Sequence, residues 1–425
     1  MLINSPETHY DIVIAGGGLV GGSFALLLDA LPAMRNLRIL LVDNAALGND
    51  ASDASKPFDA RSTAISWGSR QIFLQAGLWD QLYPGLTAIT DIHVSDKGHV
   101  GAARLRSDAM NVEALGYVAE NTHLNQVIAS GLLNSKQIAV LAPGSIVSVK
   151  PVPEGVSLIM AAGSQTETRI TSRLLVIADG GRSTLCEQLG ITLTRKPYGQ
   201  HALISNISFE KPHQGCAFER FTDTGPLAVL PLPDLDGEHR AALVWTLTDD
   251  QVAETMALSD EAFLAALQQR FGYRLGKLNR VGERVLYPLN LTLASEQIRP
   301  GIVLLGNVAH TLHPVAGQGL NLALRDAREL AEMMAEAVAA EQAASIGNYS
   351  WLQQYVQRQQ RDQQQTVVFS DQVTRLFSNN SPLLALGRNI GLLGMDLVPP
   401  AKRWFSRQAM GMTDRRIGPV SRRHQ

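Results

Sequence analysis

The chain has 425 residues, of which 45% are hydrophobic and 18% are charged, with a formal net charge of −2. These values are typical of a soluble globular protein with two or three domains, and they give no sign of nucleic-acid binding. The two cysteines, Cys186 and Cys216, are too few for a disulfide framework or a metal cluster. We therefore expect a protein of a reducing compartment that binds no metal.

The N-terminal segment has the spacing of a dinucleotide-binding unit. A strand predicted at residues 10–15 is followed by Gly16, Gly18 and Gly21 and then by helical periodicity, and a second apolar run ends at Asp43, 22 residues after Gly21. In such a βαβ unit the first glycine permits the tight turn, the second lets a pyrophosphate approach, and the third lets helix and strand pack closely. We expect the pyrophosphate on the helix N-terminus and the ribose hydroxyls on Asp43. The pattern does not distinguish FAD from NAD.

The same segment is apolar enough to be compared with a membrane span. Residues 12–28 carry no charge over 17 positions, which is fewer than the ~20 that a spanning helix needs. No basic residue precedes them, as a signal peptide would require, and several glycines interrupt them. We predict a cytoplasmic protein that touches a membrane at most peripherally.

Residues 59–73 are predicted to form a helix that Gly77 closes, with Arg61 in its first turn. An arginine there opposes the helix dipole, so Arg61 is either a surface residue or a functional one. Alternating residues at 88–118 predict antiparallel strands, and residues 123–133 predict a helix. Further short strands are predicted at 138–141, 146–150, 156–160, 168–171 and 174–177.

Asp179 and Gly180 follow the last of these strands, where an apolar run meets an acid and glycines for the second time. On a doubly wound sheet such loops gather at the carboxyl ends of the strands, where ligands bind. Asp179 is therefore a candidate site residue, with a helix-capping or turn aspartate as the alternative. Residues 200–290 then alternate as in an antiparallel sheet, with a helix at 260–271. This indicates a second domain, inserted before the nucleotide-binding fold resumes.

Residues 301–326 return to the nucleotide-binding fold. The apolar run 302–305 predicts a buried parallel strand that ends at Gly306, and a glycine-containing loop leads to a helix from Leu320 to about residue 344. Gly317 and Gly319 let a flat ligand touch the backbone. Free N–H groups at the helix N-terminus favour an acceptor that gains negative charge, such as the pyrimidine edge of a reduced flavin. An ordinary glycine-rich turn before a surface helix is the alternative.

The C-terminal part begins with a long helix predicted at 351–377. An apolar stretch at 383–398 precedes a basic end, in which seven cations stand against one acid, Asp414. The cations are Lys402, Arg403, Arg407, Arg415, Arg416, Arg422 and Arg423. Apolar residues interleaved with cations suit an anionic membrane surface or an acidic partner. A helix that covers the protein's own core, followed by a frayed tail, explains the pattern equally well.

Three motifs, at 16–21, 178–180 and 306–321, together resemble the three FAD fingerprints of the class A aromatic-ring flavin monooxygenases, in the same order. Residues 59–61 are similar to that family's arginine motif near the isoalloxazine. More narrowly, four stretches resemble the ubiquinone-biosynthesis hydroxylases, and most nearly their 2-octaprenyl-6-methoxyphenol hydroxylase branch. These stretches are 93–101, 218–232, 287–292 and 313–326.

The resemblance implies an α/β fold like that of para-hydroxybenzoate hydroxylase. It predicts a Rossmann-like FAD-binding domain at 1–87, 119–190 and 291–345 with an inserted antiparallel β-sheet substrate domain at 88–118 and 191–290. Residues 346–425 would form the C-terminal helices and the basic tail. The implied cofactor-binding residues are Gly16, Gly18, Gly21, Asp43, Arg61, Asp179, Gly180, Gly306, Asn307, Gly317, Gln318, Gly319, Leu320 and Asn321.

Several of these residues receive a role from the resemblance. Residues 317–321 would present backbone donors to the flavin's pyrimidine edge, Pro314 would pack beside its reactive face, and Arg61 would help to hold it. Asn307 stands where the family has aspartate, which predicts weaker retention of FAD, and Asp43 stands where many relatives have glutamate. No general base is assigned, because the nearness of His310 and His313 in sequence is not hydrogen-bond geometry.

The resemblance also implies a reaction. NAD(P)H, bound transiently, reduces FAD, oxygen adds to give a flavin hydroperoxide, and its distal oxygen attacks the ring of a polyprenylated phenol in ubiquinone biosynthesis. Other ubiquinone-biosynthesis proteins and a membrane surface, contacted through residues 381–425, are the expected partners. Two alternatives remain open at this point: an FAD-dependent isoprenoid dehydrogenase or reductase, and an FAD-stabilised scaffold subunit of the biosynthetic complex.

Overall fold

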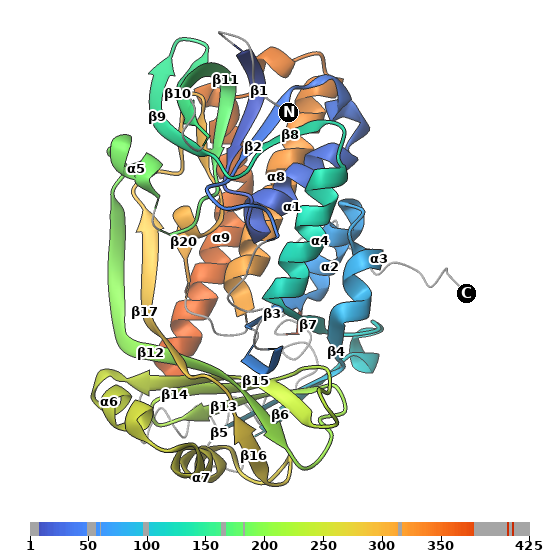
Figure 1. Ribbon diagram of the computed structural model, residues 1–425, viewed down its shortest axis with the longest axis vertical. Helices are drawn as coiled ribbons and strands as arrows, with labels where there is room; N and C mark the ends of the chain where they lie inside the picture. Colours follow the sequence, from blue (N-terminus) through green and yellow to red (C-terminus); the bar gives the residue numbers. More distant parts are fainter. Residues whose placement is uncertain are drawn as a thin grey trace.

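Two β-sheets lie at opposite ends of the molecule, and long strands and helices run between them (Figure 1). This arrangement comes from a computed structural model, which describes residues 8–48, 57–59, 61–96, 102–162, 167–181, 183–312, 317–377, 406–407 and 410–411. A third sheet lies between the two larger ones and consists of three strands, in the order β3 (Ser62–Ser66), β7 (Gly116–Glu120) and β4 (Leu86–Ile89).

The first sheet has a parallel core, β19-β11-β1-β2-β8, to which β18 and the hairpin β9-β10 add antiparallel strands. Side chains of β1 alternate between two buried clusters, with Ile12 and Ile14 on one face and Val13 and Ala15 on the other. Both faces are therefore covered, as expected for a parallel sheet with nearly continuous apolar strands. The strands are β1 (Thr8–Ala15), β2 (Ile39–Val42), β8 (Ile138–Leu141), β9 (Ser145–Val152), β10 (Gly155–Ala161), β11 (Thr168–Ile177), β18 (Ile298–Arg299) and β19 (Ile302–Leu304).

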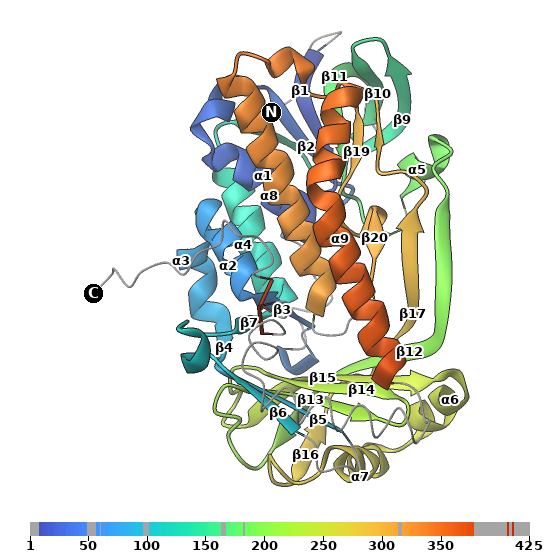
Figure 2. The same cartoon turned by 180° about the vertical axis from the view of Figure 1, so that it is seen from behind.

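Four helices pack against one face of this sheet and share its hydrophobic core. They are α1 (Leu19–Ala30), α4 (Asn121–Asn134), α8 (Gln318–Ala339) and α9 (Tyr349–Phe377). Phe24, Ile128, Leu324 and Tyr355, one from each helix, belong to one buried cluster. Figure 2 shows α8 and α9 side by side, with α9 reaching the second sheet, where it contacts β14. No helix of the described residues has the length and apolarity needed to cross a membrane.

The second sheet is largely antiparallel, in the order β20-β17-β12-β15-β14-β13-β5-β6, with β16 paired to β12. Two of its strands, β12 and β17, run along one side of the molecule and connect its ends (Figure 1). One face of the sheet packs on α7, where Trp245 meets Phe263. The elements are β5 (Asp91–Asp96), β6 (Ala102–Arg106), β12 (Leu193–Phe209), β13 (Cys216–Thr222), β14 (Gly225–Pro231), β15 (His239–Thr248), α6 (Asp249–Ala257), α7 (Asp260–Phe271), β16 (Leu278–Val281), β17 (Val285–Ala294) and β20 (His310–Thr311).

The helix predicted at 59–73 is wrong over its first half. Ser62–Ser66 is strand β3, which pairs with β7 from Ser62 opposite Glu120 to Ser66 opposite Gly116. The helix begins only at Trp67, because the Ser66 side chain caps it by accepting from the Ser69 N–H. Pairing with a strand far away in sequence outweighs the local helical pattern. The remaining elements of this region are α2 (Trp67–Gln75), α3 (Trp79–Leu82), β4 (Leu86–Ile89) and β7 (Gly116–Glu120).

Other predicted elements agree with the structure to different degrees. The helix at 260–271 is confirmed at both ends, and Gly77 follows α2 with a φ of 69°. The strands predicted at 168–171 and 174–177 are one strand, β11, and helix α8 stops at Ala339 instead of residue 344. Strand β13 lies within residues 200–290, which were predicted to form an antiparallel sheet, but its own bounds were not predicted. The proposed domain boundaries stay a prediction.

Candidate functional site

The turn between β1 and α1 is held open by its glycines. Gly16 has a φ of 106°, and a Cβ there would lie 2.5 Å from the Ala178 carbonyl oxygen, so no other residue fits. A Cβ on Gly21 would lie 2.0 Å from the Gly16 carbonyl oxygen, which explains how closely the helix packs on the strand. Gly18 has nothing within 4 Å of its Cβ position and borders open space at the helix N-terminus. No acidic side chain occupies the first turn of α1, so its N–H groups stay available to an anion.

Two carboxylates flank this turn. Asp43 accepts from the backbone N–H of Gly17 at 2.6 Å and from that of Ala45 at 2.8 Å, one bond to each carboxylate oxygen. Asp179 accepts from the Ser183 hydroxyl at 2.8 Å. The Asp179 side chain is reached by solvent, yet the walls around it desolvate the carboxylate, and this raises its pKa although the Ser183 hydrogen bond opposes the shift.

The segment before α8 completes the wall opposite α1. Gly317 takes a left-handed conformation, with a φ of 62°, where the chain turns into the helix, and its Cβ position lies 3.0 Å from the Ala64 Cβ. Gly319 has open space at its Cβ position. Asn307 is exposed, whereas Gln318 is buried. A flat ligand can therefore approach the backbone at Gly319 without meeting a side chain.

These three segments line one cavity of about 670 Å³. Of the predicted site residues, those on its wall are Gly16, Gly18, Asp43, Asp179, Gly180, Asn307, Gly317, Gly319, Leu320 and Asn321. The cavity continues past strand β3 to apolar residues of the second sheet, among them Ile204, Leu230 and Val244. It thus joins a polar, glycine-lined end to an apolar end.

The polar end fits the dinucleotide part of FAD. A pyrophosphate needs free N–H groups and a backbone without side chains, and both are present at Gly18 and the first turn of α1. Each oxygen of Asp43 already accepts one bond and has a second lone pair that can accept from a ribose hydroxyl. The open backbone at Gly319 suits the edge of a flat ring system.

Four predicted site residues lie off this wall. Gly21 and Gly306 lie in the packing behind it, where a Cβ on Gly306 would approach Val20 at 3.1 Å, and Gln318 is buried. Arg61 is exposed, and its guanidinium donates to the Tyr287 hydroxyl at 3.1 Å. Pro314 and His313 lie outside the described residues, so the structure makes no statement on the role predicted for Pro314.

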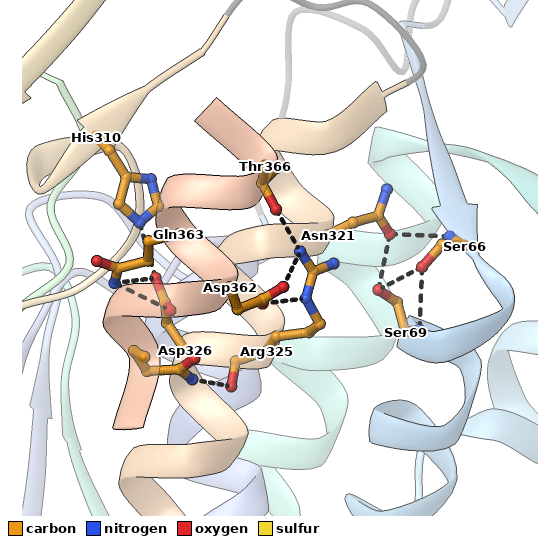
Figure 3. A network of polar contacts seen from close by, with 10 residues as sticks. Ser66, Ser69, His310, Asn321, Arg325, Asp326, Asp362, Gln363 and Thr366 are labelled. Atoms are coloured by element: carbon orange, nitrogen blue, oxygen red, sulfur yellow. Dashed lines mark hydrogen bonds and ion pairs between the residues drawn. The ribbon is translucent and has the colours of Figure 1, made fainter. Parts of the chain in front are cut away.

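A polar network holds the start of α8 in place (Figure 3). The buried Asn321 amide donates to the carbonyls of Gly317 and Ala64, and its oxygen accepts from the Ser66 N–H and the Ser69 hydroxyl. All hydrogen-bonding positions of this amide are used. The side chain of Asn321 thus fixes the glycine turn against strand β3. The role predicted for this residue was a different one, a backbone N–H donor to the flavin.

Further along, the network joins α8 to α9. His310 lies 2.7 Å from the Asp326 carboxylate, to which Gln363 also donates, and Arg325 donates to Asp362 at 2.6 Å. His310 is buried and is not on the cavity wall. Its nearness to the glycine turn in sequence therefore does not place its ring beside a substrate.

One ionisable residue on the wall was missed from the sequence. Glu219 of strand β13 lies at the apolar end of the cavity. The alternation of apolar residues around it, in Phe218-Glu219-Arg220-Phe221, could have indicated a strand. It could not have shown which face of the strand meets the cavity.

The chain is similar to known proteins over nearly its whole length. The sequence matches a family described as "FAD binding domain" over residues 9–370. It is 35% identical over 422 residues to a protein of Rhodospirillum rubrum named ubiquinone hydroxylase UbiL, covering 98% of this chain and 92% of that one. It is 28% identical over 404 residues to 3-demethoxyubiquinol 3-hydroxylase of Escherichia coli, covering 95% and 98%.

The structure is similar to that of p-nitrophenol 4-monooxygenase PnpA from Pseudomonas putida. The TM-score is 0.76 at 18% identity, and the match covers 97% of this chain and 100% of that one. At this identity the similarity concerns the fold alone. The predicted α/β fold, with a nucleotide-binding sheet and a second antiparallel sheet, is confirmed.

Proposed function

The chain belongs to the FAD binding domain family and is an FAD-dependent aromatic monooxygenase, and we propose that its substrate is a polyprenylated phenol of ubiquinone biosynthesis, hydroxylated on the ring. The observation that carries the proposal is the single cavity that leads from the glycine-lined nucleotide end to the apolar face of the second sheet. Hydroxylases named for the ubiquinone pathway match this chain over nearly its whole length, which supports the substrate class.

Each part of the wall has a task in this reaction. Bound FAD, after reduction by NAD(P)H, supplies the activation of oxygen. Gly16, Gly18 and Asp43 would hold the nucleotide, and backbone N–H groups at the N-terminus of α8 would donate to the pyrimidine edge of the ring. The apolar residues of the second sheet bind the phenol ring and exclude water from the place of oxygen transfer.

The test is to purify the protein, record its flavin spectrum and follow NAD(P)H oxidation with a panel of short-chain prenylphenols. We expect bound flavin, faster NAD(P)H oxidation when a phenol is present, and product with one oxygen atom from isotopically labelled O₂. Stimulated oxidation without incorporated oxygen would point instead to a dehydrogenase or reductase. Bound flavin without any stimulation would point to a scaffold subunit.

We also propose that residues 381–425 contact an anionic membrane surface or other ubiquinone-biosynthesis proteins. Nearly all of this segment lies outside the described residues. Within the part that is described, Met410 is buried in the main core and its carbonyl accepts from the Gly68 N–H at 2.9 Å. This contact attaches the C-terminal segment to helix α2, and most of the tail's cations follow it in sequence.

A further inference from the structure

The ionisable side chains on the described cavity wall are unevenly placed. Asp43 and Asp179 belong to the nucleotide end, next to the turn of α1. Glu219 is the one ionisable side chain among the described residues of the apolar end. A carboxylate at that end faces the place where the proposed function puts the phenol, and it is not needed to bind the nucleotide.

Strand register explains why Glu219 points into the cavity. It lies opposite Val94 of β5 and opposite Ala228 of β14, and the same row continues through Val244 of β15 to Ile204 of β12. Side chains at one level across paired strands share a face of the sheet. Ala228, Val244 and Ile204 all line the cavity, so Glu219 lies on the cavity face in an otherwise apolar row.

The neighbours of Glu219 along β13 behave as this register requires. Phe218 packs edge-on against Phe271 of α7, on the covered face of the sheet. Ala217, two residues before Glu219, is buried and lines the cavity. The carboxyl therefore cannot turn to the α7 side without displacing packed aromatic residues.

No packing requirement accounts for a carboxyl at this position. Among the described residues no hydrogen bond or ion pair to Glu219 is present, and burial alone raises its pKa from 4.5 to about 7. An unpaired carboxylate on an apolar wall is unfavourable, whereas an alanine or valine would continue the row. A pKa near neutrality is what a general base needs in order to accept a proton at working pH.

We infer that Glu219 is the catalytic base of the ring hydroxylation, accepting the proton of the substrate's phenolic hydroxyl; this rests on the proposed function. The ring carbon forms its bond to one atom of O₂ as the O–O bond breaks, and the other oxygen atom leaves as water with the two electrons that NAD(P)H supplies. In the same step the phenolic O–H bond breaks and its electron pair stays with the ring system. The proton is bound by a Glu219 carboxylate oxygen. The ring carbon then releases its hydrogen as a proton to water, and the C–H electron pair restores aromaticity. Glu219 gives its own proton back to the product oxygen or to water, so the residue is unchanged after each turnover.

The test uses the FAD-loaded enzyme with the best prenylphenol and measures hydroxylated product between about pH 5.5 and about pH 9, a range that spans a base with a pKa near neutrality. In the unchanged enzyme the rate should rise with pH through about 7. Glu219→Gln should lower kcat by roughly 10²–10⁴-fold and abolish this rise, because an amide accepts no proton. Glu219→Asp should restore part of the rate together with the rise.

Glu254→Gln is the matched control, since Glu254 is an exposed carboxylate on α6 of the same sheet region, and its rate and pH profile should match those of the unchanged enzyme. FAD content should be equal in all variants. Should the glutamine variant fold poorly, Glu219→Leu carries the same test, because leucine suits the apolar row.

A Glu219→Gln enzyme that hydroxylates at the full rate with the same pH profile would overturn the assignment and leave the proposed function intact. Failure of the unchanged enzyme to hydroxylate any phenol would instead refute the proposed function.

Discussion

A carboxyl on an apolar wall makes stability depend on pH. The folded-state pKa of Glu219, about 7, lies above the ordinary value of 4.5, so between these values the folded protein binds the proton more tightly than the unfolded chain does. The contribution of Glu219 to the free energy of unfolding is therefore highest below pH 4.5, where the carboxyl is protonated in both states. It falls as the pH rises through 7, where the folded protein loses this proton. At alkaline pH the folded state carries the full penalty of the charged side chain.

Glu219→Gln should remove this penalty. We expect the variant to gain stability relative to the unchanged protein between about pH 5 and about pH 8, by about 3 kcal/mol at most. Denaturant unfolding at both pH values measures the difference, with Glu254→Gln as the control that shows no such gain. An equal difference at the two pH values would mean that Glu219 is not desolvated in the folded protein.

Asn307 offers a second test at a single position. It lines the cavity with its side chain exposed, while its backbone carbonyl accepts from the Thr311 hydroxyl at 3.0 Å. Asn307→Asp keeps the shape and supplies a charged acceptor for a ribityl hydroxyl, so we expect FAD to bind roughly tenfold more tightly.

Titration of the apoprotein by flavin fluorescence measures this affinity. Asn348→Asp, an exposed change away from the cavity wall, should leave it unchanged. Equal or weaker binding by the Asn307 variant would show that its side chain does not meet the cofactor.

Single site residues could be predicted from the sequence where they lie close together along the chain. Gly16, Gly18 and Asp43 could be identified because their spacing along one βαβ unit already places them around one turn. Glu219 could not, because its place on the wall depends on the register of five strands, one of which, β5, comes from a distant part of the chain. The element that follows Arg61 was predicted wrongly for a similar reason, because Ser62–Ser66 is a strand held by pairing with residues 116–120 and not the first half of a helix. The role predicted for Arg61 itself stays a prediction.

Among the elements, the packing of α8 on α9 controls where the glycine turn lies. Both side chains of the His310–Asp326 pair are only 2% exposed, and Asp326 also accepts from Gln363 of α9. On the same helices Arg358 pairs with Glu336, whose side chain is 53% exposed. Asp326 connects α8 to His310 of β20 and to Gln363 of α9 in buried surroundings, whereas Glu336 connects α8 to α9 at the surface, so removing each carboxylate should have very different consequences.

Asp326→Ala should destabilise the protein by roughly 2–4 kcal/mol, because it leaves the buried His310 and the half-buried Gln363 without their partner. Glu336→Gln should cost no more than about 1 kcal/mol, since solvent screens that pair. Thermal or denaturant unfolding of the FAD-free protein compares them. We also expect weaker FAD binding in the Asp326 variant only, since α8 carries the turn at Gly317; similar losses of stability in both variants would refute this account of the network.

Element prediction from sequence succeeded where local pattern and tertiary structure agree. The helix α7 was found at both ends because Ser259 caps its start, by accepting from the Ala262 N–H, and Gly272 follows its last residue. Strand β3 was missed because its partner lies more than fifty residues away, opposite Thr63 at Ala119. Strand pairing of this kind leaves little trace in the local sequence.

On the scale of the whole molecule, the cavity exists because β12, β17 and α9 connect the two ends (Figures 1 and 2). Strand β12 pairs with β17 both at Leu193, near the nucleotide end, and at Ile204, on the cavity wall. The pairing is interrupted once, between Pro197 and His201, and the paired stretches on both sides of this irregularity connect the apolar sheet to the nucleotide end. The three fingerprints predicted that distant segments of the chain meet at one nucleotide. That the cavity continues to the apolar face of the second sheet could be seen only in the structure.

The tail provides a prediction that concerns the molecule and its surroundings. Deleting all of residues 381–425 would also remove Met410, whose side chain is 1% exposed in the main core and whose carbonyl accepts from Gly68. A loss of membrane binding in this variant could then not be distinguished from a loss of folding stability. A cut after Gly411 keeps this contact and removes only residues 412–425, which hold Arg415, Arg416, Arg422 and Arg423.

We expect the shorter deletion to leave the unfolding temperature and the FAD content unchanged while binding to anionic vesicles falls about 100-fold or more, since each arginine near such a surface contributes roughly 1 kcal/mol. Co-sedimentation with anionic and with neutral vesicles, at low and high salt, measures it. Changing the four arginines to glutamine in the full chain should reproduce the loss, because it removes charge and keeps length. Equal vesicle binding by the full and shortened chains would assign the basic end to a protein partner or to no surface at all.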